Sequence, residues 1–152
     1  MNRTDIGAPE YFHKVVDCQW ACPAHTPVPE YIRLIAAGRF ADAYMINWRS
    51  NVFPGILGRV CDRPCEPACR RGRVEDENTA KPEPVAICRL KRVAADLKDE
   101  DAVKARMPKK VAKKNGKRVA CVGAGPSALT VARDLAPLGY DITLFDGDKK
   151  AG

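Results

Sequence analysis

Three cysteines at intervals of four residues, Cys61, Cys65 and Cys69, give this sequence its clearest chemical signal. Two prolines inside the segment prevent a regular helix, so a wrapped loop can bring the three thiols to one centre. Four thiolates are the ordinary ligands of a [4Fe-4S] cluster, and one of them is often remote in sequence and followed by proline. Cys22, which stands before a proline, is the best-placed fourth ligand.

Zinc is the alternative occupant of this site, because tetrahedral zinc sites also accept four thiolates. Structural zinc sites favour closely spaced pairs of cysteines, so a three-plus-one arrangement fits zinc less well. Ordinary buried or disulfide-bonded cysteines are a third interpretation, although disulfides are rare in cytosolic proteins. Nearby arginines favour a site of net negative charge: Arg59, Arg63, Arg70, Arg71 and Arg73.

A glycine-rich run forms the second motif. Its residues read G-x-G-x-x-A: Gly123, Ala124, Gly125, Pro126, Ser127 and Ala128. Gly123 permits a tight turn, Gly125 lets the backbone approach a pyrophosphate, and Ala128 allows close helix packing. Asp146, at the end of the following predicted strand, stands where an acid binds ribose hydroxyls. The pattern predicts a dinucleotide site, and a glycine turn in some other α/β unit is the alternative.

The elements that position the two motifs differ in kind. Upstream, apolar spacing predicts a helix that begins at residues 27–30 and ends before Gly38, and further helices over 39–48 and 85–97. The inner face of the last is expected to hold Ile87, Leu90, Ala94 and Leu97. No strand is predicted before residue 118. Downstream, a strand over 118–122, a helix over 126–138 and a strand over 141–145 are expected.

Charge marks the boundary between these regions. The chain carries a formal net charge of +7, and the stretch 103–118 holds eight Lys or Arg and no acidic residue. Its lack of a sustained apolar face predicts a solvated linker. We therefore expect a helical cluster domain in 1–102, a basic linker in 103–117 and the first β-α-β of a dinucleotide-binding domain in 118–152. Because two strands cannot complete a doubly wound sheet, the sequence is expected to be the N-terminal piece of a longer protein.

Four runs in a fixed order carry a resemblance to a known family: CPAHTPVPEYIRLIAAGRF, NVFPGILGRVCDRPCEPACRRG, PVAICRLKR and GKRVACVGAGPSALTVARDLAPLGYDITLFD. They resemble the small subunits of NADPH-dependent glutamate synthase and the N-terminal region of dihydropyrimidine dehydrogenase. The resemblance implies an α-helical iron-sulfur domain followed by a Rossmann-like FAD-binding domain. It further implies an oxidoreductase in which electrons pass from NAD(P)H to FAD and through [4Fe-4S] clusters to a larger catalytic partner subunit or domain.

A second cluster is also implied by the resemblance, held in the family by a C-x-x-C pair, a further cysteine and a Glu or Gln on the following helix. Here the further cysteine is Cys18, but the pair falls on Glu10 and His13, and the helix position falls on Lys91. His13, Cys18 and Cys88 could form an unusual second site with one ligand missing. The favoured interpretation is one cluster, with Cys18 and Cys88 as free thiols.

The sequence also excludes several functions. No catalytic acid or base is indicated, no apolar run is long enough to span a membrane, and the N-terminus lacks a signal-peptide core, which predicts a cytosolic chain. A zinc-stabilised nucleic-acid-binding module would use the basic stretch, but an aromatic platform and a reading helix are missing, so no nucleic-acid partner is expected. A pure docking domain and the flavin subunit of a 2-oxoacid oxidoreductase remain alternatives.

Overall fold

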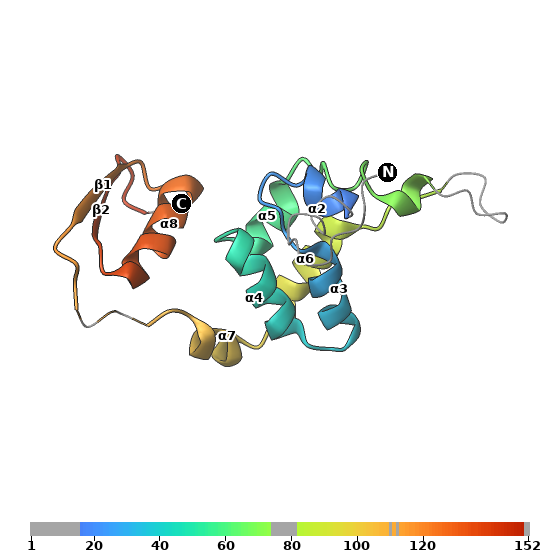
Figure 1. Ribbon diagram of the computed structural model, residues 1–152, viewed down its shortest axis with the longest axis horizontal. Coiled ribbons are helices and arrows are strands. Elements are labelled where there is room, and N and C mark those ends of the chain that lie inside the picture. The colour runs from blue at the N-terminus through green and yellow to red at the C-terminus, as the bar shows by residue number, and fades with distance from the viewer. Residues whose placement is uncertain (1–15, 74–81, 110, 112, 151–152) are drawn as a thin grey trace, which may run out of the picture.

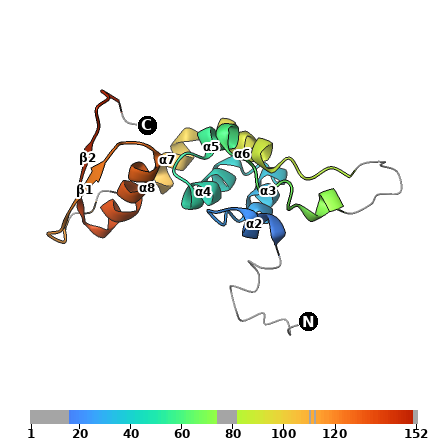
Figure 2. The ribbon, with the colours of Figure 1, turned by 90° about the horizontal axis from the view of Figure 1, so that it is seen from above.

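The computed structural model describes residues 16–73, 82–109, 111 and 113–150. It is mostly helical and includes one small sheet. A helical body and a β-α-β unit are joined through the segment that follows α7 (Figure 1). Seen from above, α2 to α6 gather into one body and α7 lies between that body and the β-α-β unit (Figure 2). No helix in the described ranges is long and apolar enough to cross a membrane.

The described residues before the β-α-β unit form six short α-helices and one 3₁₀ helix: α2 (Asp17–Ala21), α3 (Val28–Ala36), α4 (Phe40–Ser50), α5 (Pro54–Val60), η1 (Arg70–Arg73), α6 (Ile87–Asp96) and α7 (Glu100–Arg106). The three helices expected from apolar spacing are confirmed as α3, α4 and α6, with ends shifted by a few residues. Proline in the first turn of α3 presets the helical backbone. Gly38, with φ of +71°, follows the end of that helix.

The core of the body lies where α6 packs against α3, α4 and α5. Tyr31 on α3 is fully buried, and its hydroxyl donates a hydrogen bond of 3.0 Å to the carbonyl of Ile87 on α6. Burial raises the pKa of Tyr31, so the hydroxyl stays a neutral donor. Other buried members of the core are Val28, Ala43, Ile46, Cys65, Cys88 and Ala94.

One expectation about α6 is wrong. Leu97, expected on the inner face, is 58% exposed because α6 ends at Asp96 and Leu97 only caps it. The buried face instead holds Ile87, Cys88, Lys91, Ala94 and Ala95. The short helix α5 was not expected in the proline-rich region, where Pro54 begins it at the first turn.

The expected start of the linker at residue 103 lies inside α7. The Asp99 carboxylate accepts a hydrogen bond of 2.7 Å from the Ala102 amide and so caps this helix. Val103 is 3% exposed, and α7 packs against α4. The basic residues of the stretch therefore begin on a packed helix, because a cap and one buried valine outweigh the polar composition.

The β-α-β unit follows the expected order closely. Strands β1 (Arg118–Val122) and β2 (Asp141–Phe145) are parallel, with Arg118 opposite Asp141 and Val122 opposite Phe145. Both strands have the expected bounds. The intervening helix divides into α8 (Pro126–Leu135) and the 3₁₀ helix η2 (Ala136–Leu138), because Pro137 cannot donate an α-helical hydrogen bond.

Candidate functional site

Six cysteines of the helical body come from three separate segments. Cys18 lies on α2 and Cys22 follows its last turn, so this short helix supplies two thiols. Three more lie between α5 and η1, at Cys61, Cys65 and Cys69. The sixth, Cys88, is in the first turn of α6. Cys65, Cys69 and Cys88 are buried, and all six are free thiols.

Electrostatic interactions show which of these thiols are neighbours. Burial raises the pKa of Cys65 to about 12, and the thiols of Cys88, Cys22 and Cys61 act in the same direction. Burial also raises the pKa of Cys88, which in addition hydrogen-bonds with Cys61. The pKa of Cys18 is raised by burial and then by Cys69. Thiols from all three segments therefore face one region.

Hydrogen bonds to sulfur distinguish Cys22 and Cys61 from the rest. Partial burial acts to raise the pKa of Cys22, but hydrogen bonds from the backbone and side chain of Thr26 and from the backbone of Ala24 outweigh it, so the pKa is lowered. The Thr26 side chain, itself 1% exposed, lies 3.6 Å from the Cys22 sulfur. The Arg63 amide donates to the Cys61 sulfur at 3.4 Å. Donors of this kind stabilise a thiolate and tune a bound iron-sulfur cluster.

The spacing of these side chains bears on what the region can hold. Within the described part of the chain, His, Cys, Asp and Glu side chains form no group of three or more that could hold a single metal ion. Zinc–sulfur bonds of about 2.3 Å draw four sulfurs close around one ion. Thiolates are the ordinary ligands of an iron-sulfur cluster, so the donor types in this region suit that group.

Lys91, on the buried face of α6, lies among these thiols. It is only 6% exposed, and it interacts electrostatically with Cys22, Cys65 and Cys88. Among the described residues it forms no ion pair with a carboxylate. Lysine is almost never buried unless it is paired. A net-negative group held by the surrounding thiolates would complete this environment, so the residues present fit an iron-sulfur cluster.

The arginines near the cysteines are turned to other partners. Arg59 forms a two-pronged ion pair with Asp96 at 2.8 and 3.0 Å, and Arg70 pairs with Asp17 at 2.9 Å. Arg63 lies 3.8 Å from Glu66, and Arg71 donates to the carbonyl of Glu83. Among the described residues, the cation that interacts electrostatically with these thiols is Lys91, a different residue from those expected.

The glycine-rich loop lies at the carboxyl edge of the parallel sheet, between β1 and α8. Gly123 has φ of +92°, a backbone conformation that other residues rarely adopt. Gly125 caps the N-terminus of α8, and a Cβ at either glycine would meet nothing within 4 Å. The loop thus leaves open space in front of the first turn of α8, which begins at Pro126 and continues through Ser127 and Ala128.

Asp146 follows β2 at the same edge of the sheet. Its carboxylate accepts hydrogen bonds from the amides of Ala124 at 2.6 Å and Asp148 at 2.8 Å. The Asp148 and Ala124 amides hold the pKa of Asp146 below its usual range, so it is ionised at neutral pH. The fold brings the glycine loop and the acid together, and their arrangement can receive a pyrophosphate and a ribose.

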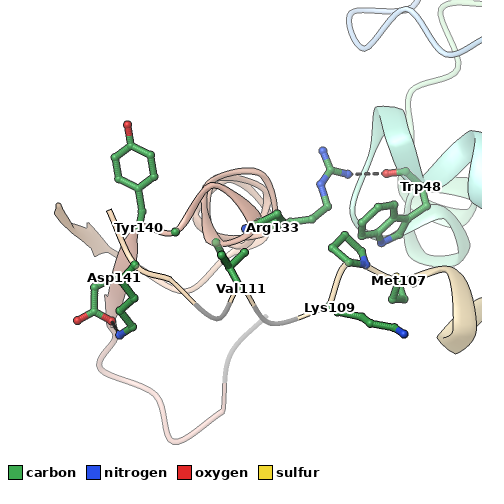
Figure 3. Close-up of a pocket in the computed structure, with 12 residues that line it drawn as sticks. Trp48, Met107, Lys109, Val111, Arg133, Tyr140 and Asp141 are labelled. Carbon is green, nitrogen blue, oxygen red and sulfur yellow. Dashed lines mark hydrogen bonds and ion pairs between the residues drawn. The ribbon is translucent and has the colours of Figure 1, made fainter. Parts of the chain in front are cut away.

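A separate cleft of about 520 Å³ lies between the helical body and the β-α-β unit. Figure 3 shows Trp48 of α4 facing Arg133 of α8 across it, with Met107 and Lys109 along one side. The Arg133 guanidinium lies 5.0 Å from the Trp48 ring centroid and donates to the Trp48 carbonyl at 2.5 Å. Asp141, at the amino end of β2, also lines the cleft, which places it at the opposite edge of the sheet from Asp146.

The structure describes two of the three residues expected in the second site, Cys18 and Cys88. His13 lies outside the described residues. Cys88, expected to be left over, is a neighbour of Cys61 and Cys65, whereas Cys18 is a neighbour of Cys69. These two thiols thus face different members of the predicted ligand set.

Sequence reasoning did not assign Lys91 or Thr26 to the site, although both had a signal. Lys91 is four residues after Ile87 and three before Ala94, so helical spacing alone puts it on the apolar face of α6. Thr26 is four residues after Cys22, but its contact with the sulfur depends on the turn that follows α2.

Comparisons with known proteins agree with this picture. Residues 12–103 match the family model described as dihydropyrimidine dehydrogenase domain II, 4Fe-4S cluster. This match covers the whole of the described region that carries the six clustered cysteines.

Curated relatives extend the similarity into the β-α-β unit. The chain is 36% identical to the beta subunit of the NADP(+)-dependent formate dehydrogenase of Moorella thermoacetica, over 89% of this chain and 21% of the relative. It is 37% identical to the beta subunit of the NADPH-Fe(3+) oxidoreductase of Geobacter sulfurreducens, over 94% and 21%. It is 35% identical to the small chain of the NADPH glutamate synthase of Mycobacterium tuberculosis, over 89% and 26%. The chain spans about a fifth to a quarter of the length of these relatives.

Proposed function

Because the chain belongs to the family of dihydropyrimidine dehydrogenase domain II with a 4Fe-4S cluster, we propose that it is the cluster-carrying, electron-transfer part of an NAD(P)H-dependent, FAD-containing oxidoreductase. The observation that carries the proposal is the set of cysteine thiols from α2, the 61–69 segment and α6 around the buried Lys91. The oxidoreductase names of the relatives support it.

The cluster ligands in this proposal are Cys22, Cys61, Cys65 and Cys69. When bound, a [4Fe-4S] cluster supplies one-electron transfer. The chain's own contribution is to hold the thiolates and exclude water, since Cys65 and Cys69 are buried. Backbone and hydroxyl donors at two of the sulfurs, described above, favour the thiolate form that ligation requires.

The glycine loop and Asp146 are proposed to hold the ADP half of FAD. The flavin supplies two-electron exchange with a nicotinamide and one-electron exchange with a cluster. The residues of the loop bind and orient: the first-turn amides of α8 face the phosphates, and the ionised Asp146 accepts from ribose hydroxyls. A Rossmann-like domain that continues from this β-α-β unit is part of the same proposal.

The electron acceptor in this proposal is a larger catalytic partner subunit or domain. The relatives named as beta subunits or small chains support an assembly of this kind. NAD(P)H is the proposed electron donor, and residues outside this chain would bind it. The physiological substrate is that of the partner.

Anaerobic purification of the full chain, followed by analysis of its iron, sulfide, zinc and visible spectrum, tests the cluster. We expect about four irons and about four acid-labile sulfides per chain, as for one cubane. A broad visible absorbance should bleach when dithionite is added. Zinc without colour would sink the electron-transfer proposal, and about eight irons would show that a second cluster had formed.

Paired serine variants test the ligand set. Cys65→Ser should abolish or greatly reduce bound iron, because it removes a buried thiolate from the proposed four. Cys121→Ser is the matched control, since Cys121 lies on β1 outside the cysteine region and should leave the iron content unchanged. Equal iron in both variants would remove Cys65 from the ligand set.

A further inference from the structure

We propose that the buried Lys91 is the counter-charge of the cluster and raises its reduction potential. The inference rests on the cluster proposed above and adds a role for a residue that is not among its ligands. Lys91 would act through space on the cluster, as a positioning and tuning residue.

Lys91 is buried without a carboxylate partner among the described residues. Lys91 is 6% exposed on the packed face of α6, between Ile87 and Ala94. No described carboxylate forms an ion pair with it. Glu66, an acid that interacts with Cys88, is engaged elsewhere, because it accepts from the Cys88 amide at 3.1 Å and lies 3.8 Å from Arg63.

The groups around Lys91 are cysteine thiols. Lys91 interacts with thiols that come from the three cysteine-bearing segments, those of Cys22, Cys65 and Cys88. Burying a charge is strongly unfavourable unless a partner of opposite sign offsets it. Neutral thiols cannot do this, whereas a four-thiolate cluster with net negative charge can.

Four arginines near the cysteines interact with groups other than the thiols. Arg59, Arg63, Arg70 and Arg71 have partners elsewhere, and all four lie at exposed or part-exposed positions. Exposed charges are screened by water and salt, whereas a buried charge acts at low dielectric. Lys91 is the buried basic residue among the described ones, so its charge is the least screened by water.

The sign of the effect follows from charge alone. Reduction adds one electron to the cluster and makes it more negative. A nearby positive charge stabilises the reduced state more than the oxidised state, so it raises the midpoint potential. Removal of that charge must lower the potential, and the electron donor in the titration, dithionite, supplies the electron in every variant.

The experiment is a redox titration of the full chain after anaerobic cluster reconstitution, followed by electron paramagnetic resonance of the reduced cluster. Lys91→Met keeps the length and volume of the side chain and removes the charge. At the wild-type midpoint, we expect the ratio of reduced to oxidised cluster to fall by about tenfold or more, which is a shift of about 59 mV for one electron. Lys91→Arg should retain a potential close to that of the wild type.

Lys98→Met is the matched control. Lys98 is also largely covered, but it pairs with Glu100 at 2.7 Å and lies over the Tyr44 ring, so it should not alter the potential. An unchanged potential in Lys91→Met at full iron content would overturn the inference while leaving the cluster proposal intact. An equal shift in Lys98→Met would also overturn it.

Loss of the cluster in the methionine variant is equally informative. If Lys91→Met fails to load iron but Lys91→Arg loads it normally, the requirement for a positive charge is supported. If both variants fail to load, the side-chain shape matters and the charge role is overturned. Absence of iron from the wild-type chain would instead overturn the cluster proposal on which the inference depends.

Discussion

At the residue scale, single backbone conformations and single charges define the two candidate sites. Gly123 combines φ of +92° with open space around its Cβ position, so its requirement for glycine is conformational. Gly125 has the same open space but φ of −75°, which any residue can adopt. Gly123 is therefore required by the turn, whereas the role proposed for Gly125 is to allow the close approach of a ligand.

This difference predicts different outcomes for two alanine variants. Gly123→Ala should destabilise the β-α-β unit by about 1–2 kcal/mol, because alanine is strained at positive φ. Gly125→Ala should leave stability nearly unchanged and weaken FAD binding instead. Urea unfolding and flavin titration of both variants measure the two effects. Equal losses of stability would contradict the assignment.

At the element scale, the ion pairs of Asp42 attach α7 to α4. Asp42, in the first turn of α4, accepts a hydrogen bond of 2.6 Å from Arg39, the N-cap residue of the same helix. It also forms an ion pair with Arg106 at the end of α7. The hydrogen bond from Arg39, together with Arg106, holds the pKa of Asp42 below its usual range. The attachment of α7 therefore depends on an ionised carboxylate.

Acidification should loosen α7. Because the folded pKa is lowered, this stabilisation is fully present above the ordinary aspartate pKa of about 3.9 and is lost as the pH falls through the folded value. The effect should stay below about 1 kcal/mol, since the pairs are partly exposed. Hydrogen-exchange protection of the Val103 amide measures it. Asp42→Asn should remove the pH dependence, and an unchanged dependence would assign it to another group.

Local sequence rules predicted some elements and could not predict others. The strands 118–122 and 141–145 were predictable because their alternation and the glycine loop between them are local signals. The packing of α7 was not, because its contacts with α4, such as that of Arg106 with Asp42, join residues that are 64 positions apart. The spacing of the cysteines was enough to select the candidate ligands. The proximity of Cys18 to Cys69, and of Lys91 to the thiols, depends on the tertiary fold.

At the scale of the whole molecule, Arg133 connects the two bodies. Its side chain on α8 is 10% exposed, stacks on Trp48 and donates to the carbonyls of Trp48 and Arg49, which lie in the last turn of α4. A cation at a helix C-terminus is favoured by the helix dipole. This contact links the β-α-β unit to the cysteine-bearing body.

Replacement of Arg133 should release the two bodies from each other. Arg133→Met removes the hydrogen bonds and the charge, so we expect a larger radius of gyration in small-angle scattering and little change in helix content. Arg89→Met, at an exposed position on α6, is the control and should leave the scattering profile unchanged. An unaltered radius in Arg133→Met would show that other contacts hold the arrangement.

The hydrogen bond from Tyr31 to Ile87 has a consequence for the rate of folding. It joins residues 56 positions apart, and Arg70–Asp17 and Arg59–Asp96 close further long loops of 53 and 37 positions. Helical proteins usually fold fast because their contacts are local, whereas distant contacts require costly loop closure first. This helical body should therefore fold more slowly than its helix content suggests. The 61–69 segment becomes enclosed only after α5 and α6, the α-helices before and after it in the chain, have packed together.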